Sequence, residues 1–283
     1  MCFTKDAKNY VPAKKPRQTV VGGSEIEKRS AENLIRWAMR ENRFEVYYQP
    51  LYNVHKEQFT EAEALLRLKD PSGKFVPPDE FIPAAEQTGL IVEIGRMVLW
   101  KTCCALRLLL ARGVEIEAVS VNLSVVQLQR EDSAEKLLRI IQEGGVSPDR
   151  IVFEVTESTI IHDYPLIAKR IRELGAAGIR FALDDFGTGY SSIAHVSDLP
   201  FDSVKIDKSL IWGSARNRKC SILTEDLAQM FRHIRLDITA EGVETEEQDR
   251  FARRCGFDKI QGFRYARPMP MDQAAALFGR RAV

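Results

Sequence analysis

Acidic and amide side chains recur along the chain where short runs rich in β-branched residues come to an end. They are Glu61, Glu63, Asn122, Glu154, Glu157, Asp184, Asp185, Asp207, Glu241, Glu244 and Gln261, and Lys205 occupies one such position as well. A single acid in such a place is usually a helix cap or a solvated loop residue. If folding brought these groups together, however, their charges would repel one another unless cations neutralised them. The repeated pattern therefore predicts a cation-binding site.

The types of side chain indicate which cations would bind. The four histidines are isolated from one another and form no HExxH pattern, which excludes a zinc site of that type. A ligand set of carboxylates together with one Asn and one Gln side chain favours binding of Mg²⁺ or Mn²⁺. With this many acids we expect two ions, and a pair about 3.5–4 Å apart can activate water for in-line displacement at phosphorus. The implied reaction is hydrolysis of a phosphodiester.

The overall charge is nearly balanced. The 283 residues include 41 Lys and Arg against 40 Asp and Glu, for a formal net charge of +1. This balance argues against a protein that covers nucleic acid or an anionic membrane with positive potential, although a local phosphate pocket remains open. We therefore expect no nucleic-acid and no membrane partner.

The cysteines and the hydropathy of the sequence indicate the cellular compartment in which the chain is located. The chain has five cysteines, an odd number without C-x-x-C spacing, which favours reduced intracellular thiols. The longest apolar stretch, at 97–110, is interrupted by Lys101 and Arg107, and the N-terminus lacks a signal-like apolar segment. We expect a cytoplasmic chain, either complete or the cytosolic part of a longer, membrane-attached protein.

Eight strands are expected to position the acidic and amide groups. They are predicted at 44–50, 59–66, 118–123, 151–155, 179–184, 203–206, 237–240 and 258–261. Helices are predicted near 25–42, over 79–112 in two pieces, and at 133–144, 164–176, 190–198, 217–233, 245–255 and 271–280. Strands that alternate with helices indicate βαβ units, and eight units in this length favour a closed α/β barrel over an open sheet.

The first strand is expected to be an exception. About eight residues separate it from the second strand, too few for a parallel crossover, which needs roughly a dozen or more. The two strands should form an antiparallel hairpin. In a barrel, the carboxyl ends of the parallel strands share one mouth, where the candidate residues would meet.

Three regions are predicted along the chain. Residues 1–23 are basic, contain prolines and a Gly pair, and indicate a flexible tail or linker. Residues 24–43 are predicted as a connector helix, beginning at a capping box formed by Ser24 and Glu27. Residues 44–283 are predicted to form one domain, the barrel.

Eight ordered motifs over about residues 31–281 resemble those of the EAL-domain family of cyclic di-GMP phosphodiesterases. They are YQP at 48–50, EALLR at 63–67, NLS at 122–124, FEVTE at 153–157, DDFGTG at 184–189, KID at 205–207, EGVET at 241–245 and QGF at 261–263. The resemblance implies a modified (β/α)8 TIM-like barrel with an antiparallel first strand. It also implies hydrolysis of cyclic di-GMP to linear pGpG with Mg²⁺ or Mn²⁺.

The resemblance also suggests roles for individual residues in binding metal. Glu63, Asn122, Glu154 and Asp184 resemble ligands of a first ion. Asp185 resembles a ligand of a second ion, with Asp184 bridging the two. Glu241 resembles a further acid of the metal and water site, and Gln261 a group that holds metal or its water.

Other matching positions concern water, substrate and a loop. Lys205 resembles a lysine that touches the attacking water, as a cation or as a proton acceptor; an interstrand ion pair is the plainer alternative. Arg67 is expected on the same side of its strand as Glu63, suited to a bidentate grip on phosphate. Leu66, Gln49 and Glu244 resemble substrate contacts, with a plain surface role equally open for Glu244. Glu157 resembles a residue that holds the loop at 185–192, which in the family couples the metal site to a dimer interface.

Two other functions compete with a constitutive enzyme. One is a catalytically silent receptor for cyclic di-GMP, although the acids and the glycine-rich loop show no substitution that would indicate it. The other is an enzyme gated by a neighbouring domain: residues 1–10 resemble the end of a GGDEF domain, with a disordered terminus as the alternative. The family resemblance further implies a homodimer and allows an upstream sensory or GGDEF domain as partner.

Overall fold

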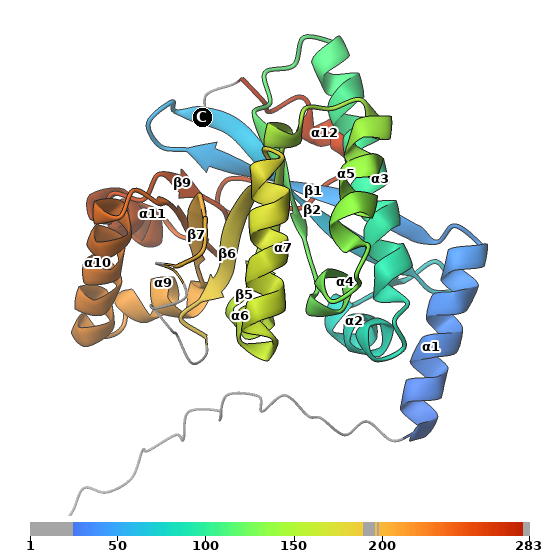
Figure 1. The fold of residues 1–283 in the computed structure, drawn as a ribbon. Coiled ribbons are helices and arrows are strands. Elements are labelled where there is room, and N and C mark those ends of the chain that lie inside the picture. The colour runs from blue at the N-terminus through green and yellow to red at the C-terminus, as the bar shows by residue number, and fades with distance from the viewer. Residues whose placement is uncertain (1–24, 189–195, 197, 280–283) are drawn as a thin grey trace, which may run out of the picture.

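The computed structural model describes residues 25–188, 196 and 198–279. Its strands are β1 Phe44–Asn53, β2 Gln58–Lys69, β3 Phe75–Val76, β4 Ala118–Asn122, β5 Ile151–Thr156, β6 Arg180–Phe186, β7 Ser203–Ile206, β8 Asp237–Ala240 and β9 Lys259–Ile260. They are hydrogen-bonded in the order β1-β9-β8-β7-β6-β5-β4-β2-β3, and an additional pairing of β1 with β2 closes the barrel. The predicted eight-stranded barrel is confirmed, with the short β3 added at the edge of β2 (Figure 1).

The first barrel strand runs against both of its neighbours, as predicted. β1 is antiparallel to β2 and to β9, whereas β2, β4, β5, β6, β7, β8 and β9 follow one another in parallel. The hairpin turns where the Asn53 side chain accepts hydrogen bonds from the backbone N–H groups of His55 and Lys56. Such a side-chain bond replaces the backbone ladder at the turn. The pairing sets Gln49 opposite Glu63.

The described helices lie outside the strands (Figure 1). They are α1 Glu25–Arg40, α2 Pro78–Gln87, α3 Ile91–Ala111, α4 Val125–Leu128, α5 Ser133–Gly144, the 3₁₀ turn Pro148–Arg150, α6 Glu157–His162, α7 Tyr164–Ala176, α9 Lys208–Ser214, α10 Arg218–His233, α11 Glu246–Cys255 and α12 Met271–Ala274. Helix α5 packs between α3 and α7. Within the described part of the chain, none of the helices combines the length and apolar character needed to span a bilayer.

Apolar side chains at helical spacing fasten these helices to the barrel. In α7, Ile167, Ile171 and Leu174 are fully buried. They belong to the same core cluster as Phe153 of β5 and Phe181 of β6, whose ring centroids lie 5.9 Å apart. Burying one such side chain contributes about 1.5–3 kcal/mol. The packed barrel wall therefore gives the strand ends a rigid support.

Several predicted elements need correction. The last helix ends at Ala274 instead of residue 280, because Phe278 forms a bridge with Phe59 and Gly279 donates to the Phe59 carbonyl. Helices α4, α6 and α9 and strand β3 were not predicted. The predicted tail at 1–23 and most of the predicted helix at 190–198 lie outside the described residues.

Candidate functional site

Lys205 is the centre of the candidate site. It comes from β7, and its side chain is only 3% exposed. Its ammonium lies within ion-pair distance of four carboxylates from different strands: Glu241 Oε1 at 2.8 Å, Glu154 Oε2 at 3.1 Å, Asp184 Oδ1 at 3.1 Å and Glu63 Oε2 at 3.3 Å. We call these five side chains the Lys205 cluster. The strands thus bring together four of the predicted acids at one mouth of the barrel.

The cluster holds more negative charge than one ammonium balances. Burial lowers the pKa of Lys205, but the surrounding carboxylates raise it well above its usual value, so this side chain is a cation. Burial raises the pKa of Glu154 well above normal, and the charge of Glu63 adds to this effect. Burial likewise raises the pKa of Glu241 to about 8. Glu63 differs: burial opposes its ionisation, yet Lys205 and two amide donors lower its pKa.

Asp184 and Asp185 face the same mouth because the strand is irregular between them. Adjacent residues of a regular strand point to opposite faces. Here the pairing of β6 with β7 shifts register between Leu183 and Phe186, and Asp185 has a positive φ of 55°. Carboxylate oxygens of Asp184, Asp185 and Glu241 consequently lie within 4.8 Å of one another. Burial, followed by the charge of Asp184, raises the pKa of Asp185 to about 6.

Amide side chains orient Glu63. Asn122 Nδ2 donates to Glu63 Oε1 at 2.9 Å, and Gln261 Nε2 donates to Glu63 Oε2 at 2.6 Å. Gln261 also donates to Gln49 Oε1 at 3.1 Å, while Gln49 Nε2 donates to the Ala266 carbonyl at 3.0 Å. Gln49 is therefore buried and accepts a hydrogen bond from Gln261, which itself contacts Glu63.

Several oxygens of the site suit a divalent cation. Among the described residues, Glu154 Oε2, Asp184 Oδ1 and Gln261 Oε1 are buried without a hydrogen-bond partner, and the first two form an ion pair with Lys205. Buried polar atoms are normally paired, so unpaired carboxylate and amide oxygens beside like charges fit a bound metal ion. An all-oxygen donor set fits Mg²⁺ or Mn²⁺.

A cleft of about 430 Å³ adjoins the cluster. Its wall includes Leu66, Arg67, Asn122, Glu154 and Asp185. The guanidinium of Arg67 donates to the Leu66 carbonyl at 2.9 Å and lies 5.8 Å from the centre of the Tyr47 ring. The cleft thus joins a group that can grip phosphate to the acids of the cluster.

The loop after β8 needs glycine to place Glu241. Gly242 has φ of 62°, and a Cβ there would lie 2.4 Å from Lys208 Cβ. Its carbonyl accepts a 2.7 Å hydrogen bond from the indole of Trp212. Helix α9, which carries Lys208 and Trp212, therefore fixes the backbone next to Glu241.

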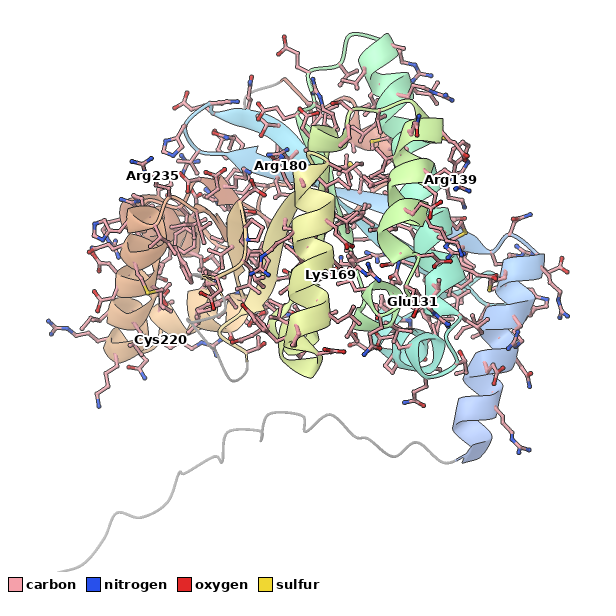
Figure 2. All side chains as sticks on the ribbon, in the orientation of Figure 1. Glu131, Arg139, Lys169, Arg180, Cys220 and Arg235 are labelled. Carbon is pink, nitrogen blue, oxygen red and sulfur yellow. The ribbon has the colours of Figure 1, made fainter. Side chains whose placement is uncertain are left out.

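Glu61 does not belong to the site, although it shares a strand face with Glu63. It pairs with Ala118 at the beginning of β4, whereas Glu63 pairs with Ser120. Its carboxylate contacts Lys259 Nζ at 2.9 Å and Arg180 Nη1 at 3.4 Å. Both cations are first residues of parallel strands, and Figure 2 shows Arg180 beside the end of the β1–β2 hairpin. Glu61 thus belongs to an ion-pair network at the opposite end of the barrel.

Three other predicted positions lie outside the cluster. Asp207 is the N-cap of α9, where its side chain accepts from Ser209 N–H at 2.8 Å. The Glu244 side chain is exposed, and its backbone N–H donates to Gln248. Glu157 is buried at the first position of α6, and its predicted loop partner falls largely outside the described residues.

The sequence motifs assign no role to Ser124 or Gln127, which lie at the edge of the cleft. Ser124 caps α4 directly after the β4 strand and donates to Glu86 Oε1 at 2.5 Å. Gln127 completes a capping box by accepting from Ser124 N–H at 3.2 Å. The Ser-x-x-Gln spacing could have revealed this short helix.

Comparisons with known proteins support one family. Residues 32–268 match the family described as "EAL domain". "Signaling protein YkoW" of Bacillus subtilis (strain 168) is 36% identical over 253 residues, covering 89% of this chain and 32% of that protein. "Bifunctional diguanylate cyclase/cyclic di-GMP phosphodiesterase MucR" of Pseudomonas aeruginosa is 35% identical over 242 residues, covering 86% of this chain and 35% of that protein. The chain thus spans about a third of the length of these relatives.

A solved structure is similar to this chain in both fold and sequence. "PaMucR Phosphodiesterase, c-di-GMP complex" superposes with a TM-score of 0.82 at 34% identity, covering 87% of this chain and 99% of that one.

Proposed function

The chain belongs to the EAL domain family, and on that premise we propose that it is a metal-dependent phosphodiesterase that hydrolyses cyclic di-GMP to linear pGpG. The observation that carries the proposal is the Lys205 cluster, in which three buried carboxylates and the half-buried Glu241 surround one ammonium next to a cleft. The name of MucR as a cyclic di-GMP phosphodiesterase, and the cyclic di-GMP complex of its solved domain, support this substrate.

The residues that would hold metal are those predicted from the sequence. Glu63, Asn122, Glu154 and Asp184 would hold one Mg²⁺ or Mn²⁺, and Asp185 a second one shared with Asp184. Glu241 and Gln261 would hold metal or its water. When bound, such ions lower the pKa of water and stabilise charge on the phosphoryl oxygens. The unpaired oxygens of Glu154, Asp184 and Gln261 support this ligand set.

Lys205 acts in this proposal as a cation. The carboxylates that raise its pKa favour the protonated form. An ammonium can donate a hydrogen bond to the attacking water and orient it, but it cannot accept the proton from that water. Glu241, whose carboxylate lies 2.8 Å from Lys205, would take that proton when it is ionised.

Substrate binding would involve four positions. Arg67 would grip a phosphate of the dinucleotide, and Leu66 would contact it from the same wall of the cleft. Gln49 would act mainly by holding Gln261. Glu244, exposed three residues after Glu241, would meet substrate from the loop after β8.

The experiment that tests the proposed function separates turnover from binding. Cyclic di-GMP is incubated with the protein and Mg²⁺ or Mn²⁺, linear pGpG is followed by chromatography, and binding is measured in parallel. Accumulation of pGpG over many turnovers supports the proposal. Tight binding without product would show a receptor for cyclic di-GMP instead of a phosphodiesterase. Absence of both binding and product would contradict both functions.

The remaining expectations concern the setting of the domain. We propose that Glu157 holds the loop after β6 and that this loop links the site to a homodimer interface. We also propose that α1 connects the barrel to an upstream sensory or GGDEF domain, since the match to this chain covers only 32% and 35% of the two curated relatives. A cytoplasmic location is consistent with the free thiols of Cys103, Cys104, Cys220 and Cys255.

A further inference from the structure

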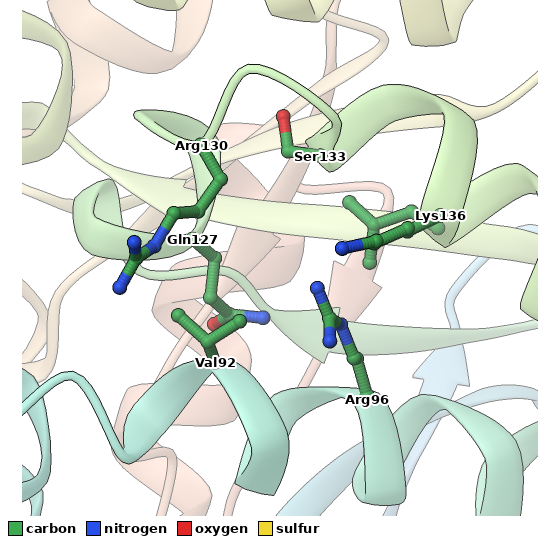
Figure 3. A pocket seen from close by; sticks show the side chains of 7 residues that line it. Val92, Arg96, Gln127, Arg130, Ser133 and Lys136 are labelled. Atoms are coloured by element: carbon green, nitrogen blue, oxygen red, sulfur yellow. The ribbon is translucent and has the colours of Figure 1, made fainter.

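A second cavity lies on the helical side of the barrel. Its outer part, of about 260 Å³, is lined by residues that include Arg96 of α3, Arg130 of the α4–α5 connection and Lys136 of α5. It narrows to a recess of about 10 Å³ that these three cations share with Gln127 and Ser133. Figure 3 shows Arg96 and Lys136 reaching towards each other across this space. We call the cavity and its recess the basic pocket.

The charges of the basic pocket are only partly compensated. Lys136 pairs with Asp132, which lies at the rim. Among the described residues, no acid lies within ion-pair distance of Arg96 or Arg130. The rim residue Glu93 is exposed. Asp132 also attracts Arg96. Two acids therefore face three cations from three separate elements, and the one excess positive charge favours an anion.

Gln127 provides an independent observation that points to a ligand. Its side chain is 94% buried, since only 6% is exposed, and it borders the recess. Its Oε1 accepts from Ser124 N–H, and its amide nitrogen forms no hydrogen bond with another described residue. That nitrogen can therefore donate a hydrogen bond to a ligand. An oxygen atom of a ligand in the recess would satisfy it.

The beginning of α5 does not add to the positive charge of the basic pocket. Asp132 precedes this helix, and its carboxylate offsets the positive end of the helix dipole although its side chain forms no capping hydrogen bond. The Ser133 hydroxyl is used elsewhere, as it donates to the Leu128 carbonyl at 3.3 Å.

We infer that the basic pocket is a second anion site, which binds the phosphate or diphosphate group of a small molecule. Arg96 and Arg130 present planar donors that match phosphate oxygens, and Lys136 adds a point charge. The recess has room for one oxygen atom next to Gln127. Gln127 also lines the catalytic cleft, so this side chain forms part of the wall between the two sites. The inference does not depend on the proposed hydrolysis.

Binding of pyrophosphate to the protein in EDTA tests the inference by isothermal titration calorimetry, with inorganic phosphate as the smaller probe. Without divalent ions the Lys205 cluster repels anions, so the basic pocket is the site examined. We expect saturable binding that weakens at least about tenfold in the double variant Arg96→Gln with Arg130→Gln. Circular dichroism and the melting temperature establish that this variant is folded.

Two control variants locate the binding. Arg139→Gln removes a cation from the same helix α5, where Arg139 pairs with Glu135 at the surface (Figure 2), and should leave the affinity unchanged. Arg67→Ala removes the cation of the catalytic cleft and should also leave it unchanged. No saturable binding, equal loss in Arg139→Gln, or loss only in Arg67→Ala would each overturn the inference. Because the assay contains neither cyclic di-GMP nor metal, a failure of the proposed function would not affect its result.

Discussion

Glu63 and Glu61 show that the position of an acid along one strand determines which group of charged side chains it joins. Both point to the same side of β2 and both are buried, yet Glu63 joins the Lys205 cluster and Glu61 the ion pairs with Lys259 and Arg180. The family motif identifies Glu63 as a metal ligand, while alternation along the strand alone treats the two acids alike. Only the register of β2 against β4 separates them.

Glu63→Gln should abolish most turnover while Glu61→Gln should not. Loss of a charged oxygen from the ligand set is expected to lower the affinity for Mn²⁺ and the rate of pGpG formation by more than about 100-fold. Glu61→Gln leaves Lys259 with weaker pairing, so it should instead lower the free energy of unfolding by about 3 kcal/mol. Turnover assays and denaturant unfolding measure the two effects. Equal loss of activity in both variants would contradict the separation of the two ends of the barrel.

Arg67→Ala should mainly raise the KM for cyclic di-GMP. The guanidinium is half-buried in the cleft wall and is held by the Leu66 carbonyl and the Tyr47 ring. Loss of a charge-assisted contact to phosphate predicts about a 10–100-fold rise in KM. Steady-state kinetics measure it, with Arg67→Lys as the variant that keeps the charge and loses the planar fork. A fall in kcat at constant KM would place Arg67 in the chemical step.

At the scale of elements, the strands were predictable and the short connecting helices were not. Short runs rich in β-branched residues predicted the strand centres, because parallel strands of the barrel such as β4 and β5 are buried on both faces. Helices α4, α6 and α9 are too short to show a helical period, although Ser124, Thr156 and Asp207 cap them directly after strands. The irregularity of β6 that turns Asp185 towards the mouth has no sequence signal, because it depends on pairing with β7.

The loop between β8 and α11 should tolerate no side chain at Gly242. Gly242→Ala combines positive φ with a contact to Lys208 Cβ and is expected to cost about 2–4 kcal/mol of unfolding free energy. It should also lower kcat, because Glu241 is the preceding residue. Gly73→Ala is the control. At Gly73 φ is 86° but no atom lies within 4 Å of the new Cβ, so this variant measures the effect of backbone strain alone. If both variants lose the same stability, the Lys208 contact does not restrain the loop.

At the scale of the whole molecule, a net charge of +1 conceals a concentration of acid at one mouth of the barrel. Five carboxylates, those of the Lys205 cluster and Asp185, are gathered near one ammonium. Repulsion among these carboxylates opposes folding of the whole barrel, because the acids come from strands around it. Metal binding should therefore stabilise the molecule as a whole.

The metal-free protein should become less stable as the pH rises from about 5 to 8. Folding raises the pKa of Glu241 from 4.5 to about 8, so the folded state binds more protons than the unfolded state over this range. Asp185, with a pKa raised to about 6, acts in the same direction. Melting temperatures in EDTA should fall across this range, and Glu241→Gln should reduce the slope.

Mn²⁺ should reverse this dependence. Binding needs the ionised carboxylates, so the affinity for metal should increase as the pH rises towards 8. A concentration about 100 times Kd adds about 2.7 kcal/mol of stability. An EDTA melting profile that rises with pH, or one that Mn²⁺ leaves unchanged, would show that the carboxylates of the mouth do not control stability.

The central claim is that the carboxylates around Lys205 hold divalent cations beside the cleft. Anomalous diffraction at the manganese edge, from crystals grown with Mn²⁺ and a non-hydrolysable analogue of cyclic di-GMP, tests it most directly. We expect one peak among Glu63, Asn122, Glu154 and Asp184, and a second one at Asp185, with phosphate of the analogue next to Arg67. Saturating Mn²⁺ without a peak at these carboxylates, while the analogue occupies the cleft, would contradict it.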